Sequence, residues 1–287
     1  MTLFSLLIIL AIERVAQKSP ALHIATIAKR YFNLIAASQP ESREQHDQSD
    51  NPQLSTEVTM LKLIVIVAFP ALIAYLVLDN IPGLFVFLIN LLVLWVCIGC
   101  PVTRQRYKQY LRAAHEKDYQ ACALHSMTFG NAGYDLNDVG KQLVLVNFRQ
   151  YAAVVITFVI FGIPGVIIYS LVKEWAAYEL SQHESATLSD AIQTLLHLVD
   201  FIPVRVVTLG FLVVGNFSNA LSAWLGVISS IKISAYDALA SVALAAEDVS
   251  NCDVEITQPK RLVRLVKRNV MFILVLLSLA TMVGLVA

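Results

Sequence analysis

The feature of this sequence that most restricts its fold is a series of long apolar blocks without a charged residue. A helix needs about 20 mostly apolar residues to cross the hydrocarbon core of a bilayer, which is about 30 Å thick. The composition agrees, since 57% of the residues are hydrophobic and 15% are charged, against about 45–50% and about 25% in soluble domains. The sequence therefore predicts an integral membrane protein. Its charge-free blocks are 63–78, 84–100, 150–172, 206–231 and 269–287.

We predict an all-α fold, a polytopic membrane helical bundle with four or five membrane segments and cytoplasmic helical loops. The whole chain, 1–287, is predicted to be a single membrane domain. Its successive parts are an N-terminal amphipathic region and polar linker (1–60), a transmembrane hairpin (61–100), a cytoplasmic helical loop (101–149), apolar segments (150–231), a cytoplasmic helix with a basic segment (232–268) and a last transmembrane helix (269–287).

Three polar or short stretches complete this prediction. The first apolar residues, up to Ile12, would rise only about 18 Å as a helix, which is too short to span. Residues 38–57 are rich in Gln, Ser, Glu, Asp and Asn, so we predict an exposed linker. Between 103 and 127, one apolar stripe on a charged helix is predicted, followed by a break at 130–133; the stripe consists of Tyr107, Tyr110, Leu111 and Ala114.

Two of the apolar blocks leave the number of crossings open. Block 150–172 contains Gly162, Pro164 and Gly165, so it either spans the membrane or folds back as a re-entrant hairpin. The second half of block 206–231 is polar. With five crossings and a cytoplasmic N-terminus, every Lys and Arg except Lys173 and Arg205 falls on the cytoplasmic side. The same charge rule holds if 150–172 is re-entrant and 206–231 does not cross.

An acid and a base interrupt the apolar run 195–206. Each charge at membrane depth costs about 2.5–3.5 kcal/mol on insertion scales, so such groups usually pair or face a cavity. Asp200 and Arg205 could pair across a bend at Pro203, because proline interrupts a helix. The alternative is that Arg205 anchors an anionic ligand. Both interpretations remain open from the sequence.

A third charged residue stands at the entrance of the block 150–172. Arg149 lies in Asn147–Tyr151 and could hold a phosphate or carboxylate with its guanidinium. It could equally be a positive-inside anchor with Tyr151 in the aromatic belt. The stretch 173–175 allows the same two interpretations. Arg149, Asp200 and Arg205 together form the predicted ligand-binding set.

The sequence offers little support for catalysis, metals or nucleic acid. The four cysteines are scattered, and the six histidines show no paired ligand spacing, so we predict no metal and no cofactor. Cys97 and Cys100 have dithiol spacing but lie in an apolar block. Phosphate-binding, dinucleotide-binding and nucleophile-elbow motifs are absent from the sequence. The net charge of zero gives no argument for a nucleic-acid partner.

Several short motifs together resemble the AmpE family. They are Met1–Phe4 with Glu13 and Arg14, Tyr110-Leu111-x-Ala113-Ala114, Asn147-Phe148-Arg149-x-Tyr151, Asp200-x-x-Pro203-Val204-Arg205, and Ala223-Trp224. The similarity spans nearly the whole chain and rests on the order and spacing of these elements. It implies a multi-pass protein of the inner membrane of Gram-negative bacteria that modulates the signalling behind inducible beta-lactamase expression.

The AmpE family is in turn distantly similar to the membrane cobinamide-phosphate synthase of cobalamin biosynthesis. The shared element is Asp200, Pro203 and Arg205 after an apolar block. Three further elements of the synthases are missing, since this chain has Phe129–Gly133, Lys173–Ala177 and Ser230–Ser234 where they would fall. The resemblance therefore gives little support for the synthase reaction in this chain.

The function that we predict is a regulatory or signalling role in the cell-wall-linked beta-lactam response, at the inner membrane and without an assigned enzyme activity. The predicted partners are the lipid bilayer and a cytoplasmic protein or an anionic small-molecule ligand. The oligomeric state is not determined by the sequence. Two alternatives are a diverged membrane-bound ligase or transferase and a transporter, although paired broken segments typical of transporters are absent from the sequence.

Overall fold

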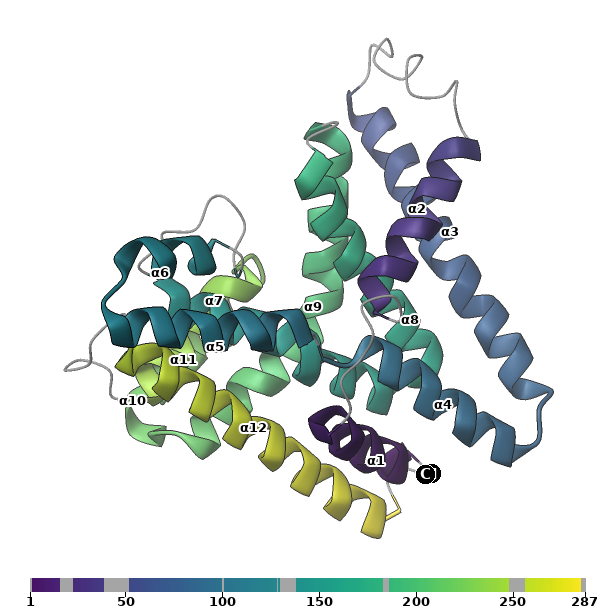
Figure 1. Ribbon diagram of the computed structural model, residues 1–287. Coiled ribbons are helices and arrows are strands. Elements are labelled where there is room, and N and C mark those ends of the chain that lie inside the picture. Colours follow the sequence, from purple (N-terminus) through teal and green to yellow (C-terminus); the bar gives the residue numbers. More distant parts are fainter. Residues whose placement is uncertain are drawn as a thin grey trace. The chain divides into compact units, whose positions relative to one another are not determined.

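A computed structural model describes residues 2–15, 23–38, 52–99, 101–127, 129, 138–182, 186–247 and 256–284. All regular elements in these ranges are helices, which confirms the predicted all-α class (Figure 1). They are α1 (Thr2–Val15), α2 (Ile24–Ser38), α3 (Pro52–Asp79), α4 (Gly83–Cys97), α5 (Pro101–Glu116), α6 (Tyr119–Ser126), α7 (Val139–Asn147), the π-helix η4 (Phe148–Ala152), α8 (Ala153–Gln182), α9 (Ala186–Val214), α10 (Phe217–Ser229), α11 (Ala235–Ala246) and α12 (Thr257–Met282).

Four helical segments in the described ranges are long and apolar enough to cross a membrane. This number agrees with the prediction of four or five. Only 17% of the apolar window in α3 is buried, and exposed apolar side chains of this kind are expected where a helix faces lipid. The four segments are Met60–Asp79, Gly83–Glu116, Val139–Glu179 and Leu188–Val214.

The positions of the segments differ from the prediction near the end of the chain. The span Leu188–Val214 replaces the predicted crossing at 206–231, because α9 ends at Val214 and α10 begins a separate short helix at Phe217. The predicted last span, 269–287, falls in α12 as far as Met282, and α12 is not among the four segments. Its first half carries the basic residues that precede Asn269.

The linker predicted over 38–57 overlaps two helices, because α2 includes Ser38 and α3 begins at Pro52. Residues 39–51 lie outside the described residues. Proline is favoured in the first turn of a helix, where its missing N–H costs no hydrogen bond.

The prediction that Pro203 interrupts a helix is wrong, since α9 continues through Pro203 to Val214. Membrane helices tolerate such a proline when neighbouring groups satisfy the freed carbonyl. The helix break predicted at 130–133 lies outside the described residues.

The chain divides into two compact units. One contains Leu3–Ile98 and Thr157–Val199, and its core joins α2, α3, α8 and α9. Phe32 of α2 stacks on Trp175 of α8 with ring centroids 4.7 Å apart, and the hydroxyl of Tyr31 donates to the carbonyl of Ile66 at 2.9 Å. Burial raises the pKa of Tyr31 above its ordinary value. Apolar packing therefore ties α2 to the long helices of this unit.

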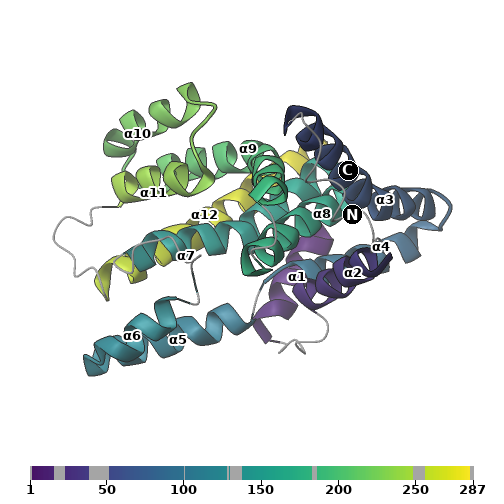
Figure 2. The same cartoon turned by 90° about the horizontal axis from the view of Figure 1, so that it is seen from above.

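The other unit contains Gly99–Ile156 and Asp200–Ala287, and its centre is α7. Helix α7 packs between α11 and α12, and Figure 2 shows α7 and α12 running side by side. The small side chains of α11, among them Ala238 and Ala243, are buried and allow close approach. The predicted stripe of α5 is confirmed, since Tyr110 and Ala114 are buried against α6, α7 and α12, with Tyr107 and Leu111 packed beside them.

Helix α8 is interrupted at Gly162, within the first of these two units. Gly162 has φ +66° and ψ −155°, a combination that is essentially restricted to glycine. Pro164 follows two residues later and cannot supply a helical N–H. The break falls where the sequence left spanning and re-entrant alternatives open, and the segment Val139–Glu179 is long enough to span.

Replacing Gly162 with Ala should lower the free energy of unfolding by about 1–3 kcal/mol, the cost of a strained backbone conformation. A Cβ at this position would meet nothing closer than 3.8 Å, so backbone strain alone should act. Thermal unfolding of the protein in detergent measures the change. Gly83→Ala is the matched control, because open space surrounds its Cβ. Equal stability of the two variants would contradict the strained geometry.

Candidate functional site

The three predicted site residues lie in one compact unit. Arg149 belongs to the π-helix η4, and Asp200 and Arg205 belong to α9. Arg149 is part of the candidate span Val139–Glu179, and the other two are part of Leu188–Val214. The three charged residues therefore come from two candidate membrane segments. The sequence placed them in one predicted ligand-binding set but did not predict that Arg149 contacts Asp200.

Asp200 forms an ion pair with Arg149. Nε and Nη2 of Arg149 donate to Oδ2 of Asp200 at 3.3 and 3.2 Å. The Asp200 side chain is 1% exposed, whereas the Arg149 side chain is 26% exposed. A carboxylate so deeply buried requires a charged partner, because burying an isolated ion is costly. The guanidinium reaches from this buried partner towards the surface of the unit.

Arg205 does not form the pair with Asp200 across Pro203, which was one of the two interpretations that the sequence left open. Its guanidinium donates from Nη1 to the carbonyl of Phe201 at 3.2 Å and from Nη2 to the carbonyl of Ser230 at 3.1 Å. Its Cζ also lies 3.5 Å from the centroid of the Phe201 ring, in cation–π contact. Because α9 stays helical through Pro203, the predicted bend that would bring the two charges together does not form.

Arg149 lies in a π-helix whose residues also bond to the start of α5. The N–H of Ala153 bonds to the carbonyl of Phe148, five residues back, which widens the turn. The carbonyl of Gln150 accepts a hydrogen bond from the N–H of Gly99 at 3.1 Å, and the Gln150 side chain donates to Thr103 at 3.1 Å. Single π-turns of this kind are frequent at functional sites.

A buried amide near the site was missed by the sequence reasoning. Nδ2 of Asn269, in α12, donates to the carbonyl of Val207, in α9, at 3.1 Å, and the Asn269 side chain is buried. Gly210 leaves the room for it, since a Cβ there would lie 1.9 Å from Oδ1 of Asn269. The only signal in the sequence was that Asn269 is a polar residue at the start of the predicted span 269–287. That signal does not identify Val207 as its hydrogen-bond partner.

The three site residues are two arginines and one aspartate. Of the two guanidiniums, that of Arg149 contacts the carboxylate of Asp200, and that of Arg205 bonds to two backbone carbonyls, so the three side chains carry a net positive charge. Among the described residues, no group of His, Cys, Asp and Glu could hold a metal ion. Lys173, which the sequence left ambiguous, forms an ion pair with its neighbour Glu174 at 3.1 Å.

Comparison with known proteins identifies the family. A family model described as "Regulatory signalling modulator protein AmpE" matches residues 1–287. The chain belongs to the AmpE family. Protein AmpE of Shigella flexneri is 30% identical over 227 residues, which cover 72% of this chain and 77% of that protein. No solved structure matches.

The family assignment confirms the predicted resemblance and the prediction of an AmpE-type regulatory membrane protein. The four apolar helical segments agree with a multi-pass membrane protein. Among the AmpE motifs quoted from the sequence, Asn147–Tyr151 lies at the π-helix and Asp200–Arg205 lies in the middle of α9. The distant similarity to cobinamide-phosphate synthase stays a prediction.

Proposed function

We propose that this AmpE-family protein resides in the inner membrane and regulates the beta-lactam response by binding an anionic ligand at Arg149, Asp200 and Arg205. The observation that carries the proposal is the excess of positive charge that these three residues place within two candidate membrane spans. Charged groups at such depth are costly and usually mark a pairing or ligand site.

The roles of the three residues in the proposal follow from their contacts. Asp200 is a positioning residue, since its carboxylate holds the Arg149 guanidinium from the buried side. Arg205 is held by the carbonyls of Phe201 and Ser230, which stabilise its position but do not neutralise its charge. Both arginines then offer planar donors to a phosphate or carboxylate of the ligand.

Arg205→Gln should shift the inducer dose for beta-lactamase expression by about tenfold, because a hydrogen bond to a charged group contributes about 1.5–3 kcal/mol. The measurement is a dose–response curve in cells that lack their own copy of the protein and express the variant instead. Arg264→Gln, on an exposed position of α12, removes the same charge and should respond like the wild type.

Immunoblots of membrane fractions must show equal amounts of each variant, because Arg205 also bonds to two backbone carbonyls. A dose–response curve that is unchanged by Arg205→Gln at equal membrane abundance would refute the ligand site. If Arg264→Gln shifted the curve by the same factor, the effect would come from the overall charge rather than from this cluster.

A further inference from the structure

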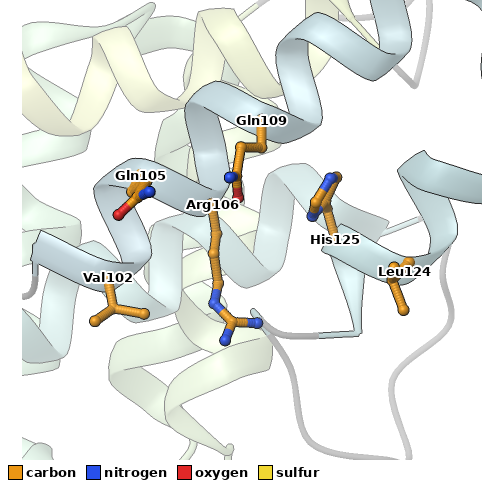
Figure 3. A pocket seen from close by; sticks show the side chains of 6 residues that line it. All are labelled: Val102, Gln105, Arg106, Gln109, Leu124 and His125. Atoms are coloured by element: carbon orange, nitrogen blue, oxygen red, sulfur yellow. The ribbon is translucent and has the colours of Figure 1, made fainter.

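A second charged site lies between α5 and α6, within the same unit as α7 and α12. An open pocket of about 440 Å³ is lined by residues of these two helices. One face of α5 and the last turn of α6 line it, with side chains that are basic, amide or apolar (Figure 3). The lining residues are Val102, Gln105, Arg106, Gln109, Leu124 and His125. No carboxylate is among them, so Arg106 gives the lining a net positive charge.

The charge of α5 is one-sided over most of its length. Its basic residues precede Glu116, the first acidic residue of the helix, and they are Arg104, Arg106, Lys108 and Arg112. The opposite face is fixed in the core by Tyr110, Ala113 and Ala114. Helix α5 therefore has an apolar face that is already covered by protein. Arg104, Lys108 and Arg112 are exposed, whereas Arg106 is half-buried and lines the pocket.

Exposed apolar side chains border the pocket beside its cation. Val102 is 47% exposed, Leu124 is 64% exposed and Met127, one turn from the pocket, is 62% exposed. Figure 3 shows the guanidinium of Arg106 extending on the same side as Val102 and Leu124. A soluble anion needs no apolar rim, whereas a lipid presents a phosphate next to its acyl chains. The rim therefore favours a phospholipid over a free phosphate.

The first turn of α5 is tied to a membrane segment of its own unit. The side chain of Gln150 donates to Thr103, and the carbonyl of Gln150 accepts from Gly99. Gln150 lies in η4, within the candidate span Val139–Glu179. These two hydrogen bonds attach the start of α5 to that span, and the pocket begins at Val102, next to Thr103.

We propose that the α5–α6 pocket binds the phosphate headgroup of an anionic phospholipid. The guanidinium of Arg106 and the imidazole of His125 face the phosphate, and Gln105 and Gln109 donate to its glycerol or phosphate oxygens. Val102 and Leu124 contact the upper part of the acyl chains. This site is separate from Arg149, Asp200 and Arg205 and does not depend on the proposed regulatory function.

Native mass spectrometry of the full-length protein in detergent tests the site, with phosphatidylglycerol as the probe. Arg106→Gln should weaken phosphatidylglycerol binding about fivefold, as expected for one basic residue at an anionic surface. Lys108→Gln is the matched control, because it removes the same charge from the same helix at a residue that does not line the pocket. It should bind like the wild type, and phosphatidylcholine should bind weakly to all three proteins.

Three outcomes would overturn the proposal. Arg106→Gln could bind phosphatidylglycerol as tightly as the wild type, Lys108→Gln could lose the same affinity, or glycerol 3-phosphate could compete at concentrations equal to those of the lipid. The last result would assign the pocket to a soluble phosphate. If Arg106→Gln does not accumulate as folded protein, His125→Gln is measured in its place against the same expectation.

Discussion

Asp200→Ala should lower the free energy of unfolding by about 3 kcal/mol. Removing one partner of a buried ion pair costs about 3–5 kcal/mol, because the other charge is left without its counter-ion. The lower end of that range applies here, since Asp200 is 1% exposed but Arg149 is 26% exposed and can still contact solvent or headgroups. Thermal or denaturant unfolding of the purified protein in detergent measures this loss.

The double variant Arg149→Met/Asp200→Leu separates the charge from the packing. It removes both ions and fills their space with apolar atoms, a replacement that is often neutral or stabilising for a buried pair. We therefore expect the double variant to be clearly more stable than Asp200→Ala. If the double variant were as unstable as the single one, the ion pair would not be the cause. An Asp200→Ala protein with wild-type stability would contradict the observed geometry directly.

Much of the membrane architecture could be predicted because hydrophobicity and the absence of charge are local properties. The charge-free runs 63–78 and 84–100 correspond to the apolar parts of α3 and α4, and the turn residues between them correspond to the short connection at Asn80–Pro82. The stripe of Tyr107, Tyr110, Leu111 and Ala114 also repeats with the period of a helix, so its burial follows from sequence alone.

The pairing of charges could not be predicted, because it depends on contacts between distant segments. Asp200 and Arg205 are close in sequence, and one of the two interpretations left open joined them through an assumed bend at Pro203. The actual partner, Arg149, is 51 residues away from Asp200. Arg149 was included in the predicted ligand-binding set because of its own motif, Asn147–Tyr151. The sequence showed no sign of its contact with Asp200. Local reasoning identified the charged residues but not their geometry.

The same limit applies where backbones approach closely. Gly210 lies in a charge-free run and carries no motif, so its sequence context gives no sign of the Asn269 amide that occupies the space beside it. A glycine in a membrane helix often marks a close helix contact, but the signal does not name the contacting residue. Only the structure shows that α9 and α12 meet there.

Gly210→Ala should destabilise the protein by about 3 kcal/mol. The new Cβ would lie 1.9 Å from Oδ1 and 2.9 Å from Cγ of Asn269, so the amide must move. Overpacking of this kind costs about 1–3 kcal/mol. The displaced amide also loses its buried hydrogen bond to the carbonyl of Val207. The midpoint of thermal unfolding in detergent or in reconstituted vesicles reports the change.

Two further variants test whether the Asn269 side chain is the cause. Gly226→Ala places a methyl group in a helix at a position with open space around it, and it should leave stability unchanged or slightly raised. Asn269→Ala removes the atoms that a Cβ at Gly210 would meet, so the double variant Gly210→Ala/Asn269→Ala should be no less stable than Asn269→Ala alone. If Gly210→Ala destabilises the protein equally with and without Asn269, the close contact between α9 and α12 is not what requires glycine at position 210.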